Sequence, residues 1–131
     1  MIFVDSNVPM YLVGAPHRHK DDARRLLERV IAAGERLVTD AEVFQEILHR
    51  YVAIRRPDAI DAAFAALSGV VDEVLDVMLE DVTAAREELR TRDGLSARDA
   101  LHVAVMRRHQ VRRILTFDTG VDGVDGVERV S

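Results

Sequence analysis

MIFVD at residues 1–5 opens this chain with a short apolar run that ends in an acid, Asp5. The same pattern returns at residues 114–118 as ILTFD, which ends in Asp118. Short apolar runs bounded by polar residues are typical of strands buried on both faces, as in a parallel sheet. If both strands run in the same direction, their aspartates lie at the carboxyl edge, where open α/β folds place active sites. We therefore expect two carboxylates from opposite ends of the chain to form a site for a hard cation.

The segments between these two runs alternate between helix and strand patterns. Thr39 and Glu42 form an S/T-x-x-E capping box that predicts a helix start, and Ser96 is the predicted N-cap of a nearly all-apolar, buried helix. Helices are expected at about 21–33, 39–52, 57–67, 79–92 and 97–109, and further strands at 37–38, 70–77 and 127–130. This alternation predicts βαβ units and a single α/β domain over residues 1–131, with a mainly parallel sheet of four to five strands.

The composition of the 131-residue chain excludes several kinds of chemistry. It has no cysteine, so a disulfide, a thiolate zinc site and a thiol nucleophile are all ruled out. Lys20 is the only lysine, and a lysine-dependent mechanism would have to use it. The net charge of −5 lacks the basic balance of a generic nucleic-acid binder, although local arginines can still bind phosphate. The acid at position 5 interrupts any signal-peptide core, and no apolar run approaches the ~20 residues that span a bilayer. We expect a soluble, cytoplasmic protein.

Two further acids are candidates for the same site. Asp99 lies in the first turn of its predicted helix, where it complements the helix dipole, but a carboxylate that enters a core also needs a partner. Glu46 lies at the border of an apolar helix stripe; it could pair with Arg50 at i,i+4 in solvent, or lean over the sheet edge. Several carboxylates in one cleft repel each other unless a cation neutralises them, and oxygen-only ligands favour magnesium or manganese. Such ions are suited to the hydrolysis or transfer of phosphate esters.

Four segments of the chain resemble the PIN-domain ribonucleases of the VapC toxin type. They are IFVDSN at 2–7, VTDAEVFQEILHR at 38–50, LSARDALHVAVMRRH at 95–109 and ILTFDTGVD at 114–122. The first and last are modest signals alone, but all four occur in order and at the right spacing in a chain of this size. The resemblance implies a PIN-like three-layer α/β/α fold over essentially the whole length.

The resemblance also implies residue roles and partners. The catalytic acids would be Asp5, Glu46, Asp99 and Asp118, of which Asp5, Asp99 and Asp118 would hold Mg²⁺, or Mn²⁺ in its place. A metal-activated water would then cut the RNA phosphodiester and leave a 5′-phosphate and a 3′-hydroxyl. Supporting roles would fall to Ser6, Asn7 and Thr116, with Asp122 as a candidate peripheral acid. The implied partners are an RNA substrate, a cognate VapB-type antitoxin and a second copy of the chain in a homodimer.

Other functions remain open at this point. A HAD-type phosphatase needs an aspartate where this chain has Asn7, and a response-regulator receiver needs a late lysine that this chain lacks. The main alternative is a PIN-fold protein that binds RNA or a partner without cutting it. His102 could reach the site but is more often a core group, so it is left out of the catalytic set. Aromatic residues are few, which argues against extensive base stacking.

Overall fold

The structure, a computed structural model, describes residues 1–130 and is built around a five-stranded sheet of order β3-β2-β1-β4-β5. The strands are β1 (Ile2–Val4), β2 (Leu37–Asp40), β3 (Glu73–Leu75), β4 (Arg113–Leu115) and β5 (Glu128–Arg129). Every neighbouring pair is parallel, so all carboxyl ends meet at one edge. The mainly parallel sheet expected from the sequence is therefore confirmed.

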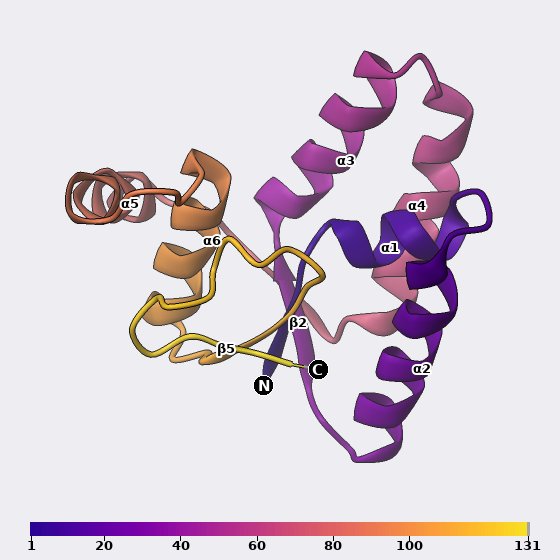
Figure 1. Ribbon diagram of the computed structural model, residues 1–131, viewed down its shortest axis with the longest axis horizontal. Helices are drawn as coiled ribbons and strands as arrows, with labels where there is room; N and C mark the ends of the chain where they lie inside the picture. The colour runs from indigo at the N-terminus through magenta and orange to yellow at the C-terminus, as the bar shows by residue number, and fades with distance from the viewer. Residues whose placement is uncertain (131) are drawn as a thin grey trace.

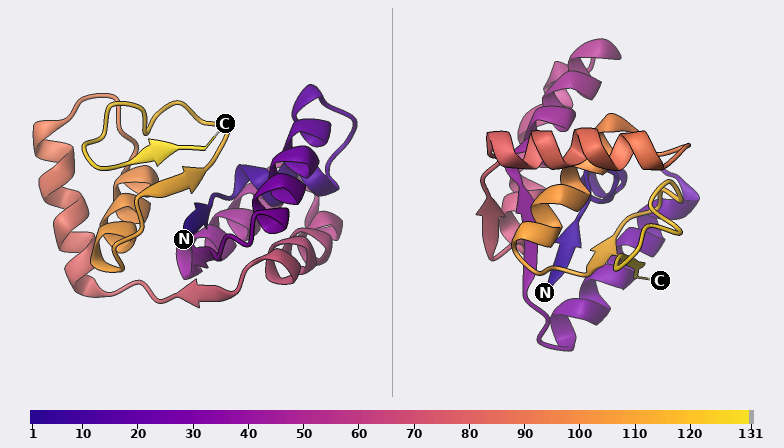
Figure 2. Two further views of the ribbon diagram at one scale, coloured as in Figure 1. Left: turned by 90° about the horizontal axis from the view of Figure 1, so that it is seen from below. Right: turned by 90° about the vertical axis from the view of Figure 1, so that its left-hand side faces the viewer.

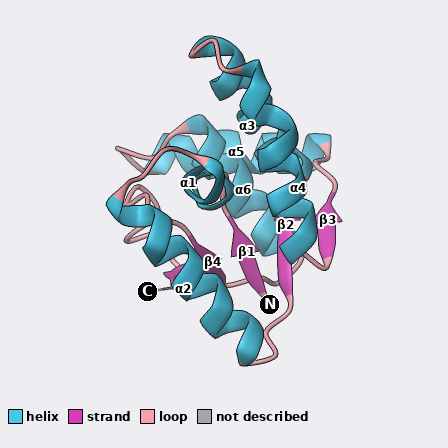
Figure 3. Ribbon diagram, turned by 90° about the vertical axis from the view of Figure 1, so that its right-hand side faces the viewer, coloured by secondary structure: helices cyan, strands magenta, loops and turns pink. Residues whose placement is uncertain are grey.

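Helices cover both faces of this sheet and make a three-layer α/β/α fold (Figures 1 and 3). The layer formed by α1, α2 and α4 lies on one face, and α5 and α6 lie together on the other (Figure 2). α3 extends from the carboxyl edge and packs against α4. The bounds are α1 (Asn7–Val13), α2 (Arg18–Ala32), α3 (Ala41–Ala53), a 3-10 turn η1 (Pro57–Ala59), α4 (Ile60–Val70), α5 (Leu79–Thr91) and α6 (Ala97–Arg108).

The central position of β1 follows from its composition. Its three residues are apolar and fully buried, because helices cover both of its faces and β2 and β4 pair with both of its edges. α6 is buried on nearly all sides, as its apolar sequence predicts, with Asp99, Ala100 and every residue from His102 through Met106 buried. Within residues 1–130 no helix is both long and apolar enough to cross a membrane.

The predicted start of α3 is wrong by one residue. Thr39 belongs to β2 and is fully buried, and its hydroxyl donates to the Val4 carbonyl oxygen at 2.8 Å instead of capping a helix. The N-cap is Asp40, whose Oδ1 accepts from the Val43 N–H at 2.9 Å. The capping box with Glu42 is therefore not formed, because the sheet uses the threonine hydroxyl.

Other boundaries also differ from the sequence expectation. β3 covers only Glu73–Leu75, since α4 continues through Val70 into the residues expected to be strand. β4 ends at Leu115, which leaves Thr116 and Phe117 in the loop before Asp118. α1, which the sequence analysis did not predict, begins directly after Ser6 and carries Asn7 in its first turn.

Candidate active site

Asp5 and Thr116 lie side by side at the carboxyl edge because β1 and β4 are in parallel register. Val4 pairs with Leu115, and the Asp5 N–H then donates to the Leu115 carbonyl oxygen at 3.1 Å. Asp5 follows Val4 and Thr116 follows Leu115, so these two residues lie opposite each other just beyond the strand ends. The Thr116 hydroxyl donates to Asp5 Oδ2 at 2.7 Å. The ends of the chain thus meet at this edge, as the two sequence patterns predicted.

The Thr116 hydroxyl connects Asp5 to the neighbouring loops. In addition to the bond it donates, its oxygen accepts from Asn7 Nδ2 at 2.9 Å and from the Asp118 N–H at 3.1 Å. A hydroxyl has one donor and two acceptor positions, so its hydrogen-bonding capacity is complete. Asn7 Oδ1 accepts in turn from the Phe117 N–H at 3.3 Å. Thr116 and Asn7 therefore fix the start of α1 against the loop that carries Asp118.

Glu46 reaches the same edge from the second turn of α3 and is 7% exposed. Its Oε2 accepts from the Ser6 hydroxyl at 2.7 Å, while the Ser6 N–H donates to Asp5 Oδ1 at 2.7 Å. Ser6 therefore bridges the two carboxylates. The solvent pairing of Glu46 with Arg50, considered from the sequence, is not what this carboxylate does.

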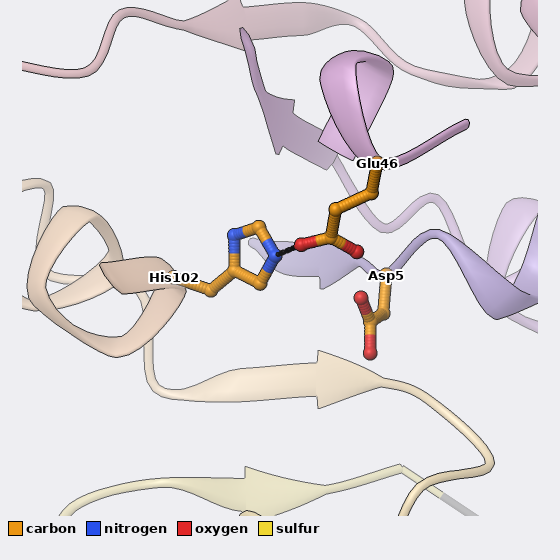
Figure 4. A group of neighbouring side chains, drawn as sticks. All are labelled: Asp5, Glu46 and His102. Atoms are coloured by element: carbon orange, nitrogen blue, oxygen red, sulfur yellow. Dashed lines mark hydrogen bonds and ion pairs between the residues drawn. The ribbon is translucent and has the colours of Figure 1, made fainter. Parts of the chain in front are cut away.

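His102 of α6 lies between two carboxylates of the β2–α3 segment, Asp40 and Glu46, and Figure 4 shows its contact with Glu46 beside Asp5. Its Nε2 is 2.5 Å from Glu46 Oε1, and its Nδ1 is 2.8 Å from Asp40 Oδ2. Burial opposes a charge on the ring, but the hydrogen bonds with Asp40 and Glu46 outweigh it and raise the pKa of His102 well above its ordinary value. With a carboxylate at each nitrogen, both nitrogens donate, and His102 is an imidazolium.

The positive charge of His102 determines which groups can hold a metal. One atom each from Asp5, Glu46 and His102 lie within 4.8 Å of one another, which is a spacing suitable for a cation. An imidazolium has no free lone pair, however, and it repels a cation. Burial raises the pKa of Glu46. The hydrogen bond from His102, the charge of His102 and the hydrogen bond from Ser6 outweigh burial, so the pKa lies below its ordinary value and Glu46 stays ionised. We therefore assign His102 to holding Glu46 rather than to binding a metal.

Asp99 and Asp118 border one small space beside Gly120. Asp99 is held in the first turn of α6, where its N–H donates to the Ser96 hydroxyl at 3.0 Å, as the predicted cap requires. Asp118 lies in the exposed loop after β4, and its Oδ1 accepts from the Gly120 N–H at 2.9 Å. A Cβ at Gly120 would lie 3.1 Å from Asp99 Oδ2 and 3.4 Å from Asp118 Oδ1. The absence of a side chain keeps the space between these two carboxylates open.

Asp5 and Asp118 are close enough to Asp99 to affect its ionisation. Burial, followed by the charges of Asp5 and Asp118, raises the pKa of Asp99 to about 6. Burial also raises the pKa of Asp5, although the charge of His102 and the bond from Thr116 act in the opposite direction. Mutual repulsion among oxygen donors is what a bound divalent cation relieves. Asp5, Asp99 and Asp118 supply oxygen atoms, which are the donors that a hard cation prefers.

Asp122 is directed into a different interaction. Its two carboxylate oxygens accept from Arg129 at 3.0 and 3.1 Å, and this ion pair lowers the pKa of Asp122. The pair fastens the glycine-containing loop after β4 to β5. Asp122 thus contributes to loop structure in place of an open ligand position.

Sequence reasoning missed the structural importance of Asp40 and His102. Asp40 is the last residue of β2 and follows three buried residues, a pattern similar to that of Asp5 after β1, but the sequence pattern favours Thr39 as the cap. His102 had no local signal, because its partners are 62 and 56 residues away in the sequence.

Comparison with known proteins identifies the family of this chain. Residues 2–127 match the family described as the PIN domain. Ribonuclease VapC13 of Mycobacterium tuberculosis is 60% identical over 131 residues, which is the full length of both chains. Ribonuclease VapC23 of the same species is 43% identical over 118 residues, covering 90% of this chain and 93% of its own.

Solved structures show the same fold. M. tuberculosis VapC20, described as a toxin that cleaves the sarcin–ricin loop, superposes with a TM-score of 0.73 at 29% identity over 90% of each chain. VapBC2 of Rickettsia felis has a TM-score of 0.72 at 16% identity and covers 99% of this chain and 98% of its own, which supports the fold alone.

An acidic edge on a three-layer parallel α/β fold, together with the family match, defines a PIN domain, and the chain belongs to that family. The full-length identity of 60% places it more narrowly. Within the PIN-domain family it is a member of the VapC ribonucleases.

Proposed function

We propose that this protein is the metal-dependent endoribonuclease toxin of a VapBC-type toxin–antitoxin module. The observation that carries the proposal is the effect of two acids from other elements on Asp99 of α6. The charges of Asp5 after β1 and Asp118 after β4 raise its pKa, and Asp118 borders the same space beside Gly120. The raised pKa of Asp99 supports the need for a neutralising cation, and the full-length similarity to VapC ribonucleases supports RNA as the substrate.

The three aspartates would hold Mg²⁺, with Mn²⁺ as a substitute, directly or through water. When bound, such an ion supplies positive charge at the scissile phosphate and makes a water molecule more acidic. Oxygen-only donors favour these hard ions over zinc or copper. Since His102 is an imidazolium, the site offers no nitrogen ligand of the kind that zinc prefers.

The remaining residues position these donors. The Ser6 N–H and the Thr116 hydroxyl each donate to one oxygen of Asp5, and these two bonds fix the orientation of its carboxylate. The Ser6 hydroxyl donates to Glu46 and so connects Asp5 to the next acid. Glu46, kept ionised by His102, completes the acidic ring and adds negative charge at the side of α3. Fixed carboxylates lose little conformational entropy when substrate and ion bind, which is the advantage of this network.

The partners are a single-stranded or looped RNA, a VapB-type antitoxin and a second copy of the chain. The antitoxin is supported by similar structures that are described as VapBC or toxin–antitoxin complexes. RNA recognition is expected to use arginines, because phosphate contacts supply much of the affinity for nucleic acid.

The decisive experiment is RNA cleavage with and without divalent metal. The wild type should cut RNA in Mg²⁺ or Mn²⁺ and not in chelator, and Asp5→Asn and Asp99→Asn should each reduce the rate by at least about 100-fold, as expected when charge stabilisation at the reacting group is lost. Asp122→Asn is the matched control and should cut at the wild-type rate. Equal cleavage by all four proteins would indicate a contaminating nuclease, and binding without cleavage would favour the non-catalytic alternative.

A further inference from the structure

Four rings from three separate segments form one contiguous cluster next to the acidic edge. Phe117 stacks on His19 with centroids 4.6 Å apart, and Tyr11 contacts Phe117 at 5.4 Å and His19 at 5.1 Å. His17 extends the cluster by stacking on Tyr11 at 5.0 Å. The scarcity of Phe, Tyr and Trp in the composition hides this cluster, since half of its rings are histidines.

The cluster borders an open pocket of about 400 Å³ between α2 and the loop after β4. Its lining combines two ring surfaces and a leucine with charged groups of both signs: His19, Asp22, Arg25, Leu26, Arg29 and Phe117. Phe117 and His19 are only partly buried, so their rings are accessible from this side. The lining matches an aromatic, polar-edged ligand better than a purely apolar one.

The pocket is joined to the proposed catalytic edge through Phe117. This residue lies in the chain between Thr116 and Asp118, and its N–H is bonded to Asn7. Thr116 is turned to Asp5, whereas the Phe117 ring is turned to α1 and α2, as its ring contacts require. A strand whose phosphate lay at Asp118 would therefore have a neighbouring nucleotide close to this pocket.

We propose that this pocket is a subsite for an unpaired nucleobase of the RNA substrate, stacked on Phe117 and His19. The inference rests on the proposed function and adds the way in which the substrate is held. Arg25 supplies a donor for a phosphate or a base oxygen, and the Asp22 carboxylate can accept from a base N–H. Recognition of RNA through splayed bases stacked on aromatic side chains is the common mode for single-stranded segments.

A tryptophan at the pocket provides a direct test, because the chain contains none. F117W is combined with D99N, to prevent cleavage, and short single-stranded RNA is titrated in without divalent metal. The emission should be quenched by RNA and not by the corresponding abasic strand. F64W in the same background is the matched control, since Phe64 on α4 forms a comparable ring pair with Phe44 on α3. The tryptophan emission of this variant should stay unchanged when RNA is added.

Affinity gives a second measurement that does not depend on a reporter. Removing the rings with F117L or H19L should weaken RNA binding by roughly 5- to 150-fold, as expected for the loss of one stacked base, while F117Y and F64L should bind like the parent. On the abasic strand the F117L effect should disappear.

The outcomes separate this inference from the function on which it rests. Wild-type protein that cuts RNA in magnesium, combined with unchanged emission for F117W and unchanged affinity for F117L, would overturn the subsite and leave the nuclease. Quenching and ring-dependent affinity without metal-dependent cleavage would support the subsite and overturn the nuclease.

Discussion

Glu46 and His102 are joined by a 2.5 Å contact between Oε1 and Nε2 that connects α3 to α6 across the carboxyl edge. The other ring nitrogen contacts Asp40, the N-cap of the same helix α3, so a single cation is paired with two buried carboxylates. The charge of His102 stabilises Asp40 and Glu46 directly, so these two buried carboxylates do not depend on a bound metal ion for a counter-charge.

Replacing His102 should therefore destabilise the fold. His102→Ala leaves Asp40 and Glu46 buried without their counter-charge, and breaking such a buried pair costs about 3–5 kcal/mol. His109→Ala is the control, since that half-buried histidine follows the same helix and its Nε2 has no hydrogen-bond partner among residues 1–130. The free energy of unfolding from urea titration checks this, and equal losses in the two variants would contradict the role of His102.

Gly120 should be essential for activity but not for stability. In Gly120→Ala the new methyl group would lie 3.1 Å from Asp99 Oδ2, so the carboxylate must move away from the space it shares with Asp118. We expect cleavage to fall by at least about tenfold, because small displacements of catalytic groups are costly. The matched control is Gly69→Ala in α4, where nothing lies within 4 Å of the added methyl and activity should be unchanged. Retained activity in Gly120→Ala would show that this space is not used.

The ionisation of Asp99 should make stability depend on pH. Its pKa rises from 3.8 to about 6 on folding, so between these values the folded protein holds a proton that the unfolded chain releases. Stability without metal should therefore decrease as the pH rises from 4 to 6. Asp99→Asn has no titrating group at this position. Its free energy of unfolding should therefore rise relative to that of the wild type by roughly 1–2 kcal/mol between pH 4 and 6, a figure reduced for solvent screening.

Unfolding free energies of the wild type and Asp99→Asn at several pH values test this directly, because the two proteins differ in this one titrating group. Adding Mg²⁺ at pH 7 should stabilise the wild type and not the variant. Parallel pH curves for the two proteins would contradict the assigned repulsion among the aspartates.

The Thr116 hydroxyl should matter through its three hydrogen bonds. Thr116→Val keeps the shape but leaves Asp5 Oδ2, Asn7 Nδ2 and the Asp118 N–H without this partner. Loss of buried hydrogen bonds of this kind costs about 1–3 kcal/mol, and the cleavage rate should fall with it. Thr116→Ser restores the hydroxyl and should recover most of both quantities. Failure of serine to rescue would point to the methyl group instead.

The sequence predicted the carboxyl edge because strand burial leaves a plain signal. β1 is apolar at every position, so Asp5 was located correctly at its end, and the helix cap at Ser96 placed Asp99 on α6. β4 was extended too far, since Phe117 continues the apolar run but packs against the rings of Tyr11 and His19 instead of joining the sheet. Local pattern cannot separate these two ways of burying a phenylalanine.

Long-range hydrogen bonds account for the other differences. Thr39 fits a capping pattern four residues long, but its hydroxyl donates to the carbonyl oxygen of Val4, which lies 35 residues earlier in the chain. α1 was not predicted because it is short and contains Pro9, which is tolerated only in a first turn. The charge on His102 likewise depends on partners that no window of local sequence contains.

The pairing of β1 with β4 has a consequence for synthesis. The hydrogen bond between Thr116 and Asp5 spans 111 residues, so the acidic edge can assemble only after the chain has emerged from the ribosome through β4 and the loop that carries Asp118. A partly made polypeptide carries Asp5 and Glu46 but neither β4 nor Asp118. For an enzyme that attacks RNA, this order of synthesis would delay the onset of cutting until the segment with β4 and Asp118 has been made and has paired with β1.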